Sequence, residues 1–255
     1  MKAPVFTIED RDRARERLIR MGREDRRVVA CAEVGSMAVG RGDRWSDLDL
    51  TFGLAAGVRA ADVLADWARE IEEEFDAVQL FDLPFLSSIY RVFLFPGALQ
   101  VDLSFTPASD FGALGPDFRL VFGETVERAH VLPPSAAYLF GLGAHHAVRA
   151  RFSIERGRVW QAEYWISGVR DQALTLACLR LGLDPWNARG FDALPEEAKA
   201  PAGEALVRSL DRDELLRALA RAIDGLLRES GAVPATAAKV EAQLRALTSE
   251  EWAGG

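Results

Sequence analysis

The sequence predicts an α/β domain around a small mixed sheet, followed by an α-helical bundle domain. Two observations carry this prediction. In the first half, short apolar runs that alternate every two residues are interleaved with amphipathic helical segments. From Pro133 onward, the chain changes to long segments rich in Ala, Leu and aromatic residues, which indicate packed helices. We therefore expect one domain over residues 1–130 and a second over residues 131–255.

The first domain divides into helices and strands at clear apolar patterns. Thr7 is the expected cap of a helix that runs to Met21, with acidic residues in its first turn. A second helix is expected over 60–75, where apolar residues recur at helical spacing. Pro96-Gly97 indicates a turn between two strands. The expected strands are 28–34, 47–54, 77–83, 88–95 and 99–105, with a short strand or turn at 119–122.

The second domain is predicted to consist of helices separated by proline-containing breaks. Asp184-Pro185 ends the second long helix, because proline cannot continue a helix. The expected helices are 135–151, 158–181, 211–228 and 236–247, and a proline-containing loop is expected over 190–203.

Composition indicates a soluble intracellular enzyme. The chain has 255 residues, of which 49% are hydrophobic, enough for a proper core. No apolar run is long enough to span a bilayer, and the N-terminal segment lacks the apolar stretch of a signal peptide, so we expect a cytoplasmic protein. Cys31 and Cys178 are expected to be reduced core thiols, because their positions suggest neither a disulfide framework nor a zinc site.

The net charge of −8 bears on the partners of the protein. Proteins that bind nucleic acid usually present a basic face, so a nucleic-acid partner is disfavoured. A cationic small molecule suits an acidic cleft better, because a cleft of one sign concentrates ligands of the other. We expect no membrane partner, and the oligomeric state stays open, with a homodimer as one alternative.

The most informative segment runs from residue 35 to residue 50. Gly35 allows a tight turn after a buried strand, and Ser36 can cap the short helix that follows and offer its hydroxyl to a phosphate. Asp47 and Asp49 lie two residues apart in a strand-like segment and project from one face. Because like charges stay together mainly where a cation neutralises them, this pair indicates a hard-metal site.

These residues carry a family resemblance. Gly35-Ser36, ten intervening residues and Asp47-Leu-Asp49-Leu resemble the signature of the nucleotidyltransferase superfamily. The superfamily includes small-molecule (antibiotic) nucleotidyltransferases, minimal nucleotidyltransferases, poly(A) polymerases and β-type DNA polymerases. The resemblance implies a third carboxylate on a later strand of the same sheet. Asp102 is the candidate, because it lies on the polar side of a cleanly alternating strand. The helical second half makes the layout similar to that of aminoglycoside or lincosamide nucleotidyltransferases.

The resemblance implies transfer of a nucleoside monophosphate from ATP, or another NTP, to a hydroxyl of a small molecule such as an aminoglycoside-like antibiotic. Asp47 and Asp49 are expected to bind two Mg²⁺ ions together with the triphosphate, and Asp102 to hold the ion nearer the acceptor. Gly35 and Ser36 are expected to cradle the phosphates.

The loop between the glycine corner and the carboxylates offers further candidates for nucleotide binding. Ser46 is expected to cap or hydrogen-bond near Asp47 and so to hold the carboxylate pair in place. Arg41 or Arg44 is expected to meet a phosphate. The alternative for at least one of these arginines is an ion pair with Asp43 in solvent.

The group that accepts the proton of the attacking hydroxyl stays open. Asp102 is one candidate, and Glu155 or Glu163 of the helical half is the other. For Glu155 we favour a plain salt bridge with Arg151, four residues earlier on the same helix face. His145 and the adjacent histidine point in different directions on a helix, so they are not expected to chelate a metal together.

Two alternatives to a small-molecule transferase remain. One is a protein-modifying nucleotidyltransferase of the antitoxin type, which is usually a short single domain; the length and the helical half of this chain disfavour it. The other is a nucleotide-binding regulator without catalysis, and the presence of all three acidic positions counts against it. The acceptor, the donor base and a role in antibiotic resistance stay open, because substrate choice depends on pocket shape.

Overall fold

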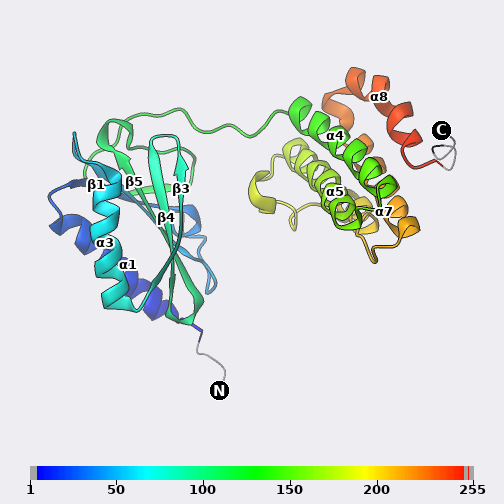
Figure 1. The fold of residues 1–255 in the computed structure, drawn as a ribbon. Coiled ribbons are helices and arrows are strands. Elements are labelled where there is room, and N and C mark those ends of the chain that lie inside the picture. The colour runs from blue at the N-terminus through cyan, green and yellow to red at the C-terminus, as the bar shows by residue number, and fades with distance from the viewer. Residues whose placement is uncertain (1–4, 250–251, 253–255) are drawn as a thin grey trace. The chain divides into compact units, whose positions relative to one another are not determined.

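The computed structural model describes residues 5–249 and 252, and the chain forms two compact units (Figure 1). The first, Met1–Val131, contains helices and a mixed sheet, whereas the described part of the second, Leu132–Gly255, contains only helices and turns. The predicted fold class, an α/β domain followed by a helical domain, is confirmed. Residues 1–4, which belong to the segment expected to lack a signal peptide, lie outside the described residues.

The first unit alternates helices and strands in the order that the apolar periodicity predicts. The Thr7 hydroxyl accepts a hydrogen bond from the Asp10 N–H, and the Asp10 carboxylate accepts one from the Thr7 N–H, which fixes the start of the first helix. The helices are α1 (Ile8–Glu24), α2 (Gly35–Ala38) and α3 (Ala60–Phe75). The strands are β1 (Val28–Val34), β2 (Leu48–Leu54), β3 (Val78–Phe85), β4 (Ser88–Phe95), β5 (Leu99–Pro107) and β6 (Phe118–Phe122).

The strands form one mixed sheet in the order β3-β4-β5-β2-β1-β6. The β2–β5 pair is parallel, and the other neighbouring pairs are antiparallel. The register of the parallel pair sets Asp49 beside Asp102 and Thr51 beside Ser104. Because side chains alternate between the two faces of a strand, all four of these residues lie on the same face of the sheet.

Helices α1 and α3 cover the other face of the sheet, which is apolar (Figure 1). Phe52 of β2 and Phe105 of β5 are fully buried there. The Trp67 ring of α3 packs edge-on against both, with ring centres 4.9 Å from Phe52 and 5.1 Å from Phe105. Burial of these aromatic and aliphatic side chains supplies the main stabilisation of the first unit.

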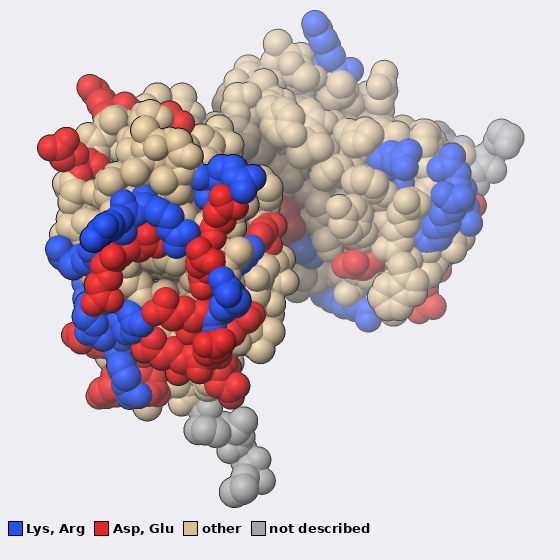
Figure 2. Space-filling model, turned by 60° about the vertical axis from the view of Figure 1, so that its left-hand side comes forward, with Lys and Arg blue, Asp and Glu red and all other residues tan. Residues whose placement is uncertain are grey.

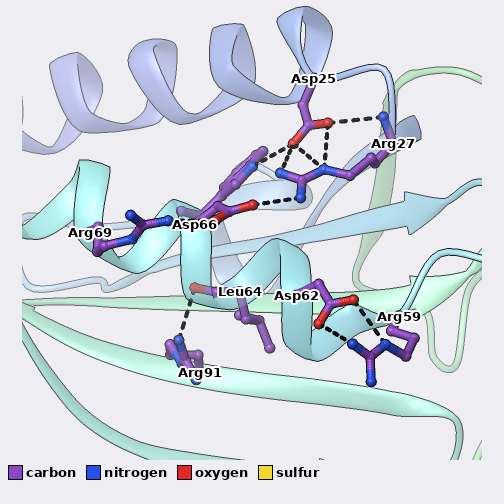
Figure 3. A network of polar contacts seen from close by, with 9 residues as sticks. Asp25, Arg27, Arg59, Asp62, Leu64, Asp66, Arg69 and Arg91 are labelled. Carbon is purple, nitrogen blue, oxygen red and sulfur yellow. Dashed lines mark hydrogen bonds and ion pairs between the residues drawn. The ribbon is translucent and has the colours of Figure 1, made fainter.

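Polar contacts join the end of α1 to the middle of α3 (Figure 3). The Asp25 carboxylate, just after α1, accepts hydrogen bonds from Arg27 at 2.8 Å and from the Trp67 indole at 3.0 Å. Arg27 also donates to Asp66 of α3 at 2.7 Å, and Arg91 of β4 donates to a backbone carbonyl of α3 at 2.9 Å. Burial raises the pKa of Asp25, but the hydrogen bonds from Arg27 and Trp67 outweigh it and lower the pKa to about 2.

A fully buried carboxylate ties α1 to the far edge of the sheet. Glu33 of β1 forms ion pairs with Arg15 of α1 and with Arg119 of β6. Both guanidinium groups keep some solvent contact, while the carboxylate itself is enclosed. This charge is therefore matched within the fold, as buried charges have to be.

The second unit has its own apolar core, formed mainly by four of its helices. Leu139 of the first helix, Val169 of the second and Leu219 of the fourth are buried in it. Its helices are α4 (Ala136–Glu155), α5 (Val159–Leu181), α6 (Glu196–Glu204), α7 (Arg212–Arg228) and α8 (Pro234–Ala246). The predicted helices of this half are confirmed, with small shifts at their ends.

Helix α6 corrects the prediction of a proline-containing loop over 190–203. Pro201 lies inside this helix, where it removes one backbone donor but does not end the helix. Glu196 and Glu197 occupy the first turn, where negative charge favours helix formation. Helix α6 packs on α7 near Gly225, so tertiary packing overrides the local signal of the proline.

The cysteines lie in the interior and most charged side chains on the surface, as in other globular proteins. Cys31 and Cys178 are buried free thiols. On the face of the first unit that Figure 2 shows, acidic and basic side chains are interleaved. Ion pairs such as Arg17 with Glu70 and Glu74 neutralise part of this charge locally. Among the described residues, no helix combines the length and the apolar character that crossing a membrane requires.

Candidate functional site

Three carboxylates converge on the open face of the sheet. Asp47 immediately precedes β2, Asp49 lies on β2, and Asp102 lies on β5 directly beside Asp49 in the parallel register. One oxygen from each of the three lies within 4.8 Å of the others, and all three side chains are half-buried. The structure therefore brings together the three residues that the sequence proposed for a metal site.

The electrostatics of this cluster favour a bound cation. Burial raises the pKa of Asp102, and the negative charge of Asp47 raises it further, against hydrogen bonds from the Gln100 amide at 3.0 and 3.2 Å. A divalent cation would remove this repulsion and stabilise the ionised form. Carboxylate oxygens are the ligands that Mg²⁺ prefers, and a set of such oxygens leaves room for phosphate oxygens and water. The donor set fits Mg²⁺.

The glycine corner lies directly against the carboxylates. Gly35 has a φ of +72°, a conformation that favours glycine. A methyl group added at this position would lie 2.6 Å from Oδ2 of Asp49, closer than any real contact allows. The missing side chain therefore makes the close approach of β1 and β2 possible at this point. The Gly35 N–H donates to the Asp117 carbonyl at 3.1 Å, so it is not available to a phosphate in this conformation.

The position of Ser36 differs from the prediction. Helix α2 begins at Gly35 and its cap residue, Val34, makes no side-chain capping bond, so Ser36 lies inside the helix and is not its cap. The Ser36 hydroxyl instead donates to the Ser46 hydroxyl at 3.2 Å. Ser46 in turn accepts a hydrogen bond from the Asp43 N–H at 2.9 Å. The two serines thus join the glycine corner to the loop that leads into Asp47.

The two arginines of this loop are both engaged. Arg41 forms an ion pair with Asp117 at 2.6 Å, although its side chain remains largely exposed. Arg44 donates to the Phe6 carbonyl, and its guanidinium lies over the rings of Phe6 and Trp45. Neither arginine pairs with Asp43 among the described residues, so that alternative is wrong; Asp43 accepts hydrogen bonds from the loop itself.

Arg11, a residue that was not predicted from the sequence, holds the same loop. Arg11 of α1 is 4% exposed, and its guanidinium donates to the carbonyls of Asp43 at 2.6 Å and of Ser46 at 2.9 Å. Arg11 therefore positions the segment that leads into Asp47. A signal existed in the sequence: Arg11 shares the buried face of its helix with Ala14 and Leu18, at helical spacing.

A second feature of this face is a cavity of about 150 Å³ that we name the hydroxyl pocket. It lies next to the carboxylates, further along β2 and β5. Aromatic rings of Phe111 and Phe118 form part of its wall, and Gly112 and Gly115 lie in the loop beside them. Its polar lining consists of Thr51, Ser88, Tyr90, Thr106, Asp110, Asp117 and Arg128. No single sequence motif predicts this pocket, because its residues come from five strands and from the segments before and after β6.

The candidate bases of the helical unit have protein partners. Glu155 forms ion pairs with Arg212 at 2.7 Å and with Arg151 at 2.6 Å. Both guanidinium groups lower the pKa of Glu155, and the hydrogen bond from Arg212 has the larger effect. The predicted salt bridge with Arg151 is therefore confirmed. Glu163 accepts a hydrogen bond from Ser167 at 2.8 Å. Among the described residues, the aspartate cluster of the first unit is the one group suited to a metal, and no histidine belongs to it.

No protein-family model matches this sequence, and no curated protein matches it either. Among solved structures, the chain is similar to an aminoglycoside 6-adenyltransferase from Bacillus subtilis. The two share 10% sequence identity with a TM-score of 0.37, over 90% of this chain and 95% of that chain. Because this TM-score is low, no activity follows from the similarity, and the arrangement of the carboxylates has to carry any proposal.

Proposed function

We propose that the protein is a Mg²⁺-dependent nucleotidyltransferase that moves a nucleoside monophosphate from ATP, or another NTP, to a hydroxyl of a small molecule. One observation carries the proposal: oxygens of Asp47, Asp49 and Asp102 lie within 4.8 Å of one another beside a glycine corner. Three carboxylates in this arrangement suit a pair of hard cations and the phosphates that those cations bind.

Each residue has a distinct role in this proposal. Asp47 and Asp49 would hold two Mg²⁺ ions with the triphosphate, and Asp102 would hold the ion nearer the acceptor. When bound, the ions supply a lowered pKa at the acceptor hydroxyl and stabilisation of the leaving pyrophosphate. The absence of a side chain at Gly35 leaves room for the Asp49 carboxylate, and Ser36 offers a hydroxyl to a phosphate at the same corner.

The proton of the attacking hydroxyl goes to Asp102 in this proposal. The hydroxyl oxygen forms a bond to the α-phosphorus, the bond from that phosphorus to the bridging oxygen breaks, and pyrophosphate leaves. Asp102 is the best-placed base because it lies beside Asp49 in the β2–β5 register, on the open face of the sheet. Glu155 suits this role less, because Arg212 and Arg151 lower its pKa. Arg41, largely exposed beside Asp117, is the arginine of the loop that a phosphate can recruit.

The direct test incubates the purified chain with Mg²⁺, each NTP and a panel of hydroxylated compounds, and searches for a nucleoside monophosphate adduct by mass spectrometry. We expect an adduct on a small molecule with the wild type. Asp47→Asn should lower the rate at least about 100-fold, because a metal ligand contributes several kcal/mol to the transition state. Asp192→Asn, a change at an exposed aspartate of the second unit, is the matched control and should have no effect.

Other outcomes of this test decide against the proposal in distinct ways. An adduct on the chain itself or on a partner protein would indicate a protein-modifying enzyme. Tight binding of nucleotide without any adduct would indicate a regulator. Unchanged turnover in Asp47→Asn would show that the aspartate cluster is not the reaction centre.

A further inference from the structure

The turn between α4 and α5 carries positive charge in a chain that is acidic as a whole. Residues 145–165 contain four arginines and two glutamates, a net charge of +2, so the rest of the chain has to carry −10 to give the total of −8. The arginines are Arg149, Arg151, Arg156 and Arg158. A net charge is an average over the whole chain, so it leaves room for a local surface that attracts anions.

Three of these four arginines have no carboxylate partner within the described residues. Arg151 is buried and forms an ion pair with Glu155. The side chains of Arg149, Arg156 and Arg158 are exposed, and in the described part of the chain they form neither an ion pair nor a hydrogen bond. Glu155 does not neutralise them, because two other guanidinium groups already engage its carboxylate. The three exposed guanidinium groups therefore keep their charge and their N–H donors for a ligand.

Aromatic side chains are exposed on the same two helices. Trp160 is 75% exposed and Tyr164 is 65% exposed. They lie four residues apart on α5, so they share one face of that helix. Phe152 of α4 is 38% exposed. A single exposed aromatic side chain is ordinary on a protein surface, whereas several gathered in one place indicate a surface that binds a ligand.

Contacts between rings and guanidinium groups connect the aromatic side chains to the free arginines. Tyr164 and Trp165 lie edge to face, with ring centres 4.9 Å apart. The Arg149 guanidinium lies over the Trp165 ring, 5.6 Å from its centre, and the Arg156 guanidinium lies over the Phe152 ring, 5.7 Å from its centre. Charge and aromatic rings therefore belong to one surface. We name it the basic aromatic surface, and it consists of Arg149, Phe152, Arg156, Arg158, Trp160 and Tyr164.

Single-stranded nucleic acid has the chemistry that matches both parts of this surface. Its phosphates need cations along the strand, and its unpaired bases stack on aromatic rings and on guanidinium planes. An acidic peptide would pair with the arginines but leave the faces of Trp160 and Tyr164 without a matching group. A duplex keeps its bases stacked on one another, so it would also leave these rings unused.

We infer that the basic aromatic surface binds single-stranded nucleic acid, with little dependence on base sequence. Arg149, Arg156 and Arg158 bind phosphates. Bases stack on Trp160 and Tyr164. Neither kind of contact uses the hydrogen-bonding edges of the bases, which is why base sequence has little influence. The inference does not depend on the proposed nucleotidyl transfer, because none of these residues belongs to the aspartate cluster.

The test measures the binding of fluorescein-labelled probes to the full-length chain by fluorescence anisotropy. The probes are a short oligothymidylate, a duplex of the same length and mixed sequence, and a polyglutamate peptide of the same length. EDTA is present throughout, so that phosphates cannot bind through Mg²⁺ at the aspartate cluster. Affinities are measured over a range of salt concentrations, because each phosphate contact releases counterions.

The variants remove stacking and charge separately. Trp160→Ala removes a ring, Trp160→Phe retains one, and Arg149→Gln removes one positive charge. The matched controls lie in the first unit: Trp45→Ala at an exposed indole, and Arg20→Gln at an exposed arginine. Thermal unfolding checks that each variant is folded.

We expect the wild type to bind the oligothymidylate more tightly than the duplex or polyglutamate. Trp160→Ala should weaken this binding at least about fivefold, as loss of one stacked base predicts, and Trp160→Phe should restore most of it. Arg149→Gln should reduce the slope of log affinity against log salt by about 0.7, the value for one phosphate contact with a single strand. Both controls should bind like the wild type. If Arg149→Gln does not fold, Arg158→Gln gives the same test.

Four results would overturn the inference. The first is no binding of the oligothymidylate by the wild type at the lowest salt concentration, and the second is equal affinity in the wild type, Trp160→Ala and Arg149→Gln. The third is tighter binding of polyglutamate, which would assign the surface to an acidic protein. The fourth is tighter binding of the duplex, which would indicate phosphate contacts without stacking. None of these results concerns Mg²⁺ at the aspartate cluster, so the proposed function is tested separately.

Discussion

The two faces of strands β2 and β5 differ in what their side chains do. On the face covered by α1 and α3, Phe52 and Phe105 are fully buried in an apolar core. On the other face, Asp102 and Thr51 occupy half-buried or buried positions and add little to that core. The same strands therefore stabilise the fold with one set of alternate residues and present polar groups to ligands with the other.

Buried charge makes the difference between the faces clear. Glu33, on the covered face, is enclosed and matched by Arg15 and Arg119. Asp102, on the open face, has the amide of Gln100 as a partner and the charge of Asp47 as a neighbour, so its pKa is raised. A carboxylate whose charge is matched inside the protein stabilises the fold, whereas carboxylates gathered against their mutual repulsion are suited to bind a cation.

The largest expected effect on stability belongs to the covered face. Phe52→Ala should lower the free energy of unfolding by about 3–5 kcal/mol, because it leaves a cavity among Trp67, Phe105 and their neighbours. Thr51→Val, one residue away on the other face, should not lower it. Denaturant unfolding of both variants measures the contrast. Similar destabilisation by the two substitutions would show that both faces of β2 contribute equally to stability, which contradicts the difference described above.

A smaller effect tests the close approach of the glycine corner to the carboxylates. Gly35→Ala places a methyl group 2.6 Å from Oδ2 of Asp49 at a φ of +72°, so it should lower both stability, by about 1–3 kcal/mol, and Mg²⁺ affinity. Gly57→Ala has a φ of +80° with no atom within 4 Å, so it should carry backbone strain alone.

Calorimetric titration of Mg²⁺ with the two glycine variants separates strain from contact. Mg²⁺ affinity should fall in Gly35→Ala and stay at the wild-type value in Gly57→Ala. An equal fall in Mg²⁺ affinity in both variants, or no fall in either, would show that the glycine corner is not part of the metal site.

The smallest effect concerns pH and the covered face. The pKa of Asp25 is about 2 in the folded protein and 3.8 when unperturbed, so the unfolded chain binds the proton more tightly. The stabilisation is therefore complete above pH 3.8 and is lost as pH falls toward 2. With solvent screening, it amounts to on the order of 1 kcal/mol.

Denaturant unfolding between pH 5 and pH 2 measures this contribution through Asp25→Asn. The variant should be less stable than the wild type at pH 5, and the difference should shrink toward pH 2. A difference that stays constant over this range would show that ionisation of Asp25 does not stabilise the junction of α1 and α3.

Local periodicity was enough to predict most of the fold, and together with the family resemblance, which implies a third carboxylate, it predicted the aspartate cluster. The alternation around Asp102 placed it on the polar face of a strand, and the spacing of Asp47 and Asp49 placed both on one side. Contacts between distant segments could not be read in the same way. Arg11 of α1 supports the loop before Asp47. It donates to the carbonyl of Asp43, which lies 32 residues further along the chain. Packing against α7 decided the structure of α6 against the local signal of Pro201.

The hydroxyl pocket could not be predicted from the sequence either. Thr51 and Tyr90 look like ordinary strand residues in the sequence, and their position near Asp102 follows from strand order and register. The helix-covered face could be predicted because burial imposes a repeating pattern. The open face imposes none, because a binding site needs particular groups at particular points.

Binding of Mg²⁺ together with ATP to the aspartate cluster is the most direct measurement of what the open face does. Calorimetric titration should compare the wild type, Asp102→Asn and the control Asp192→Asn. Asp102→Asn should lower the affinity for Mg²⁺ and ATP by at least about tenfold without lowering the thermal midpoint, because it removes a metal ligand and relieves repulsion from Asp47. Equal affinity in all three proteins would contradict a metal centre formed by these three carboxylates.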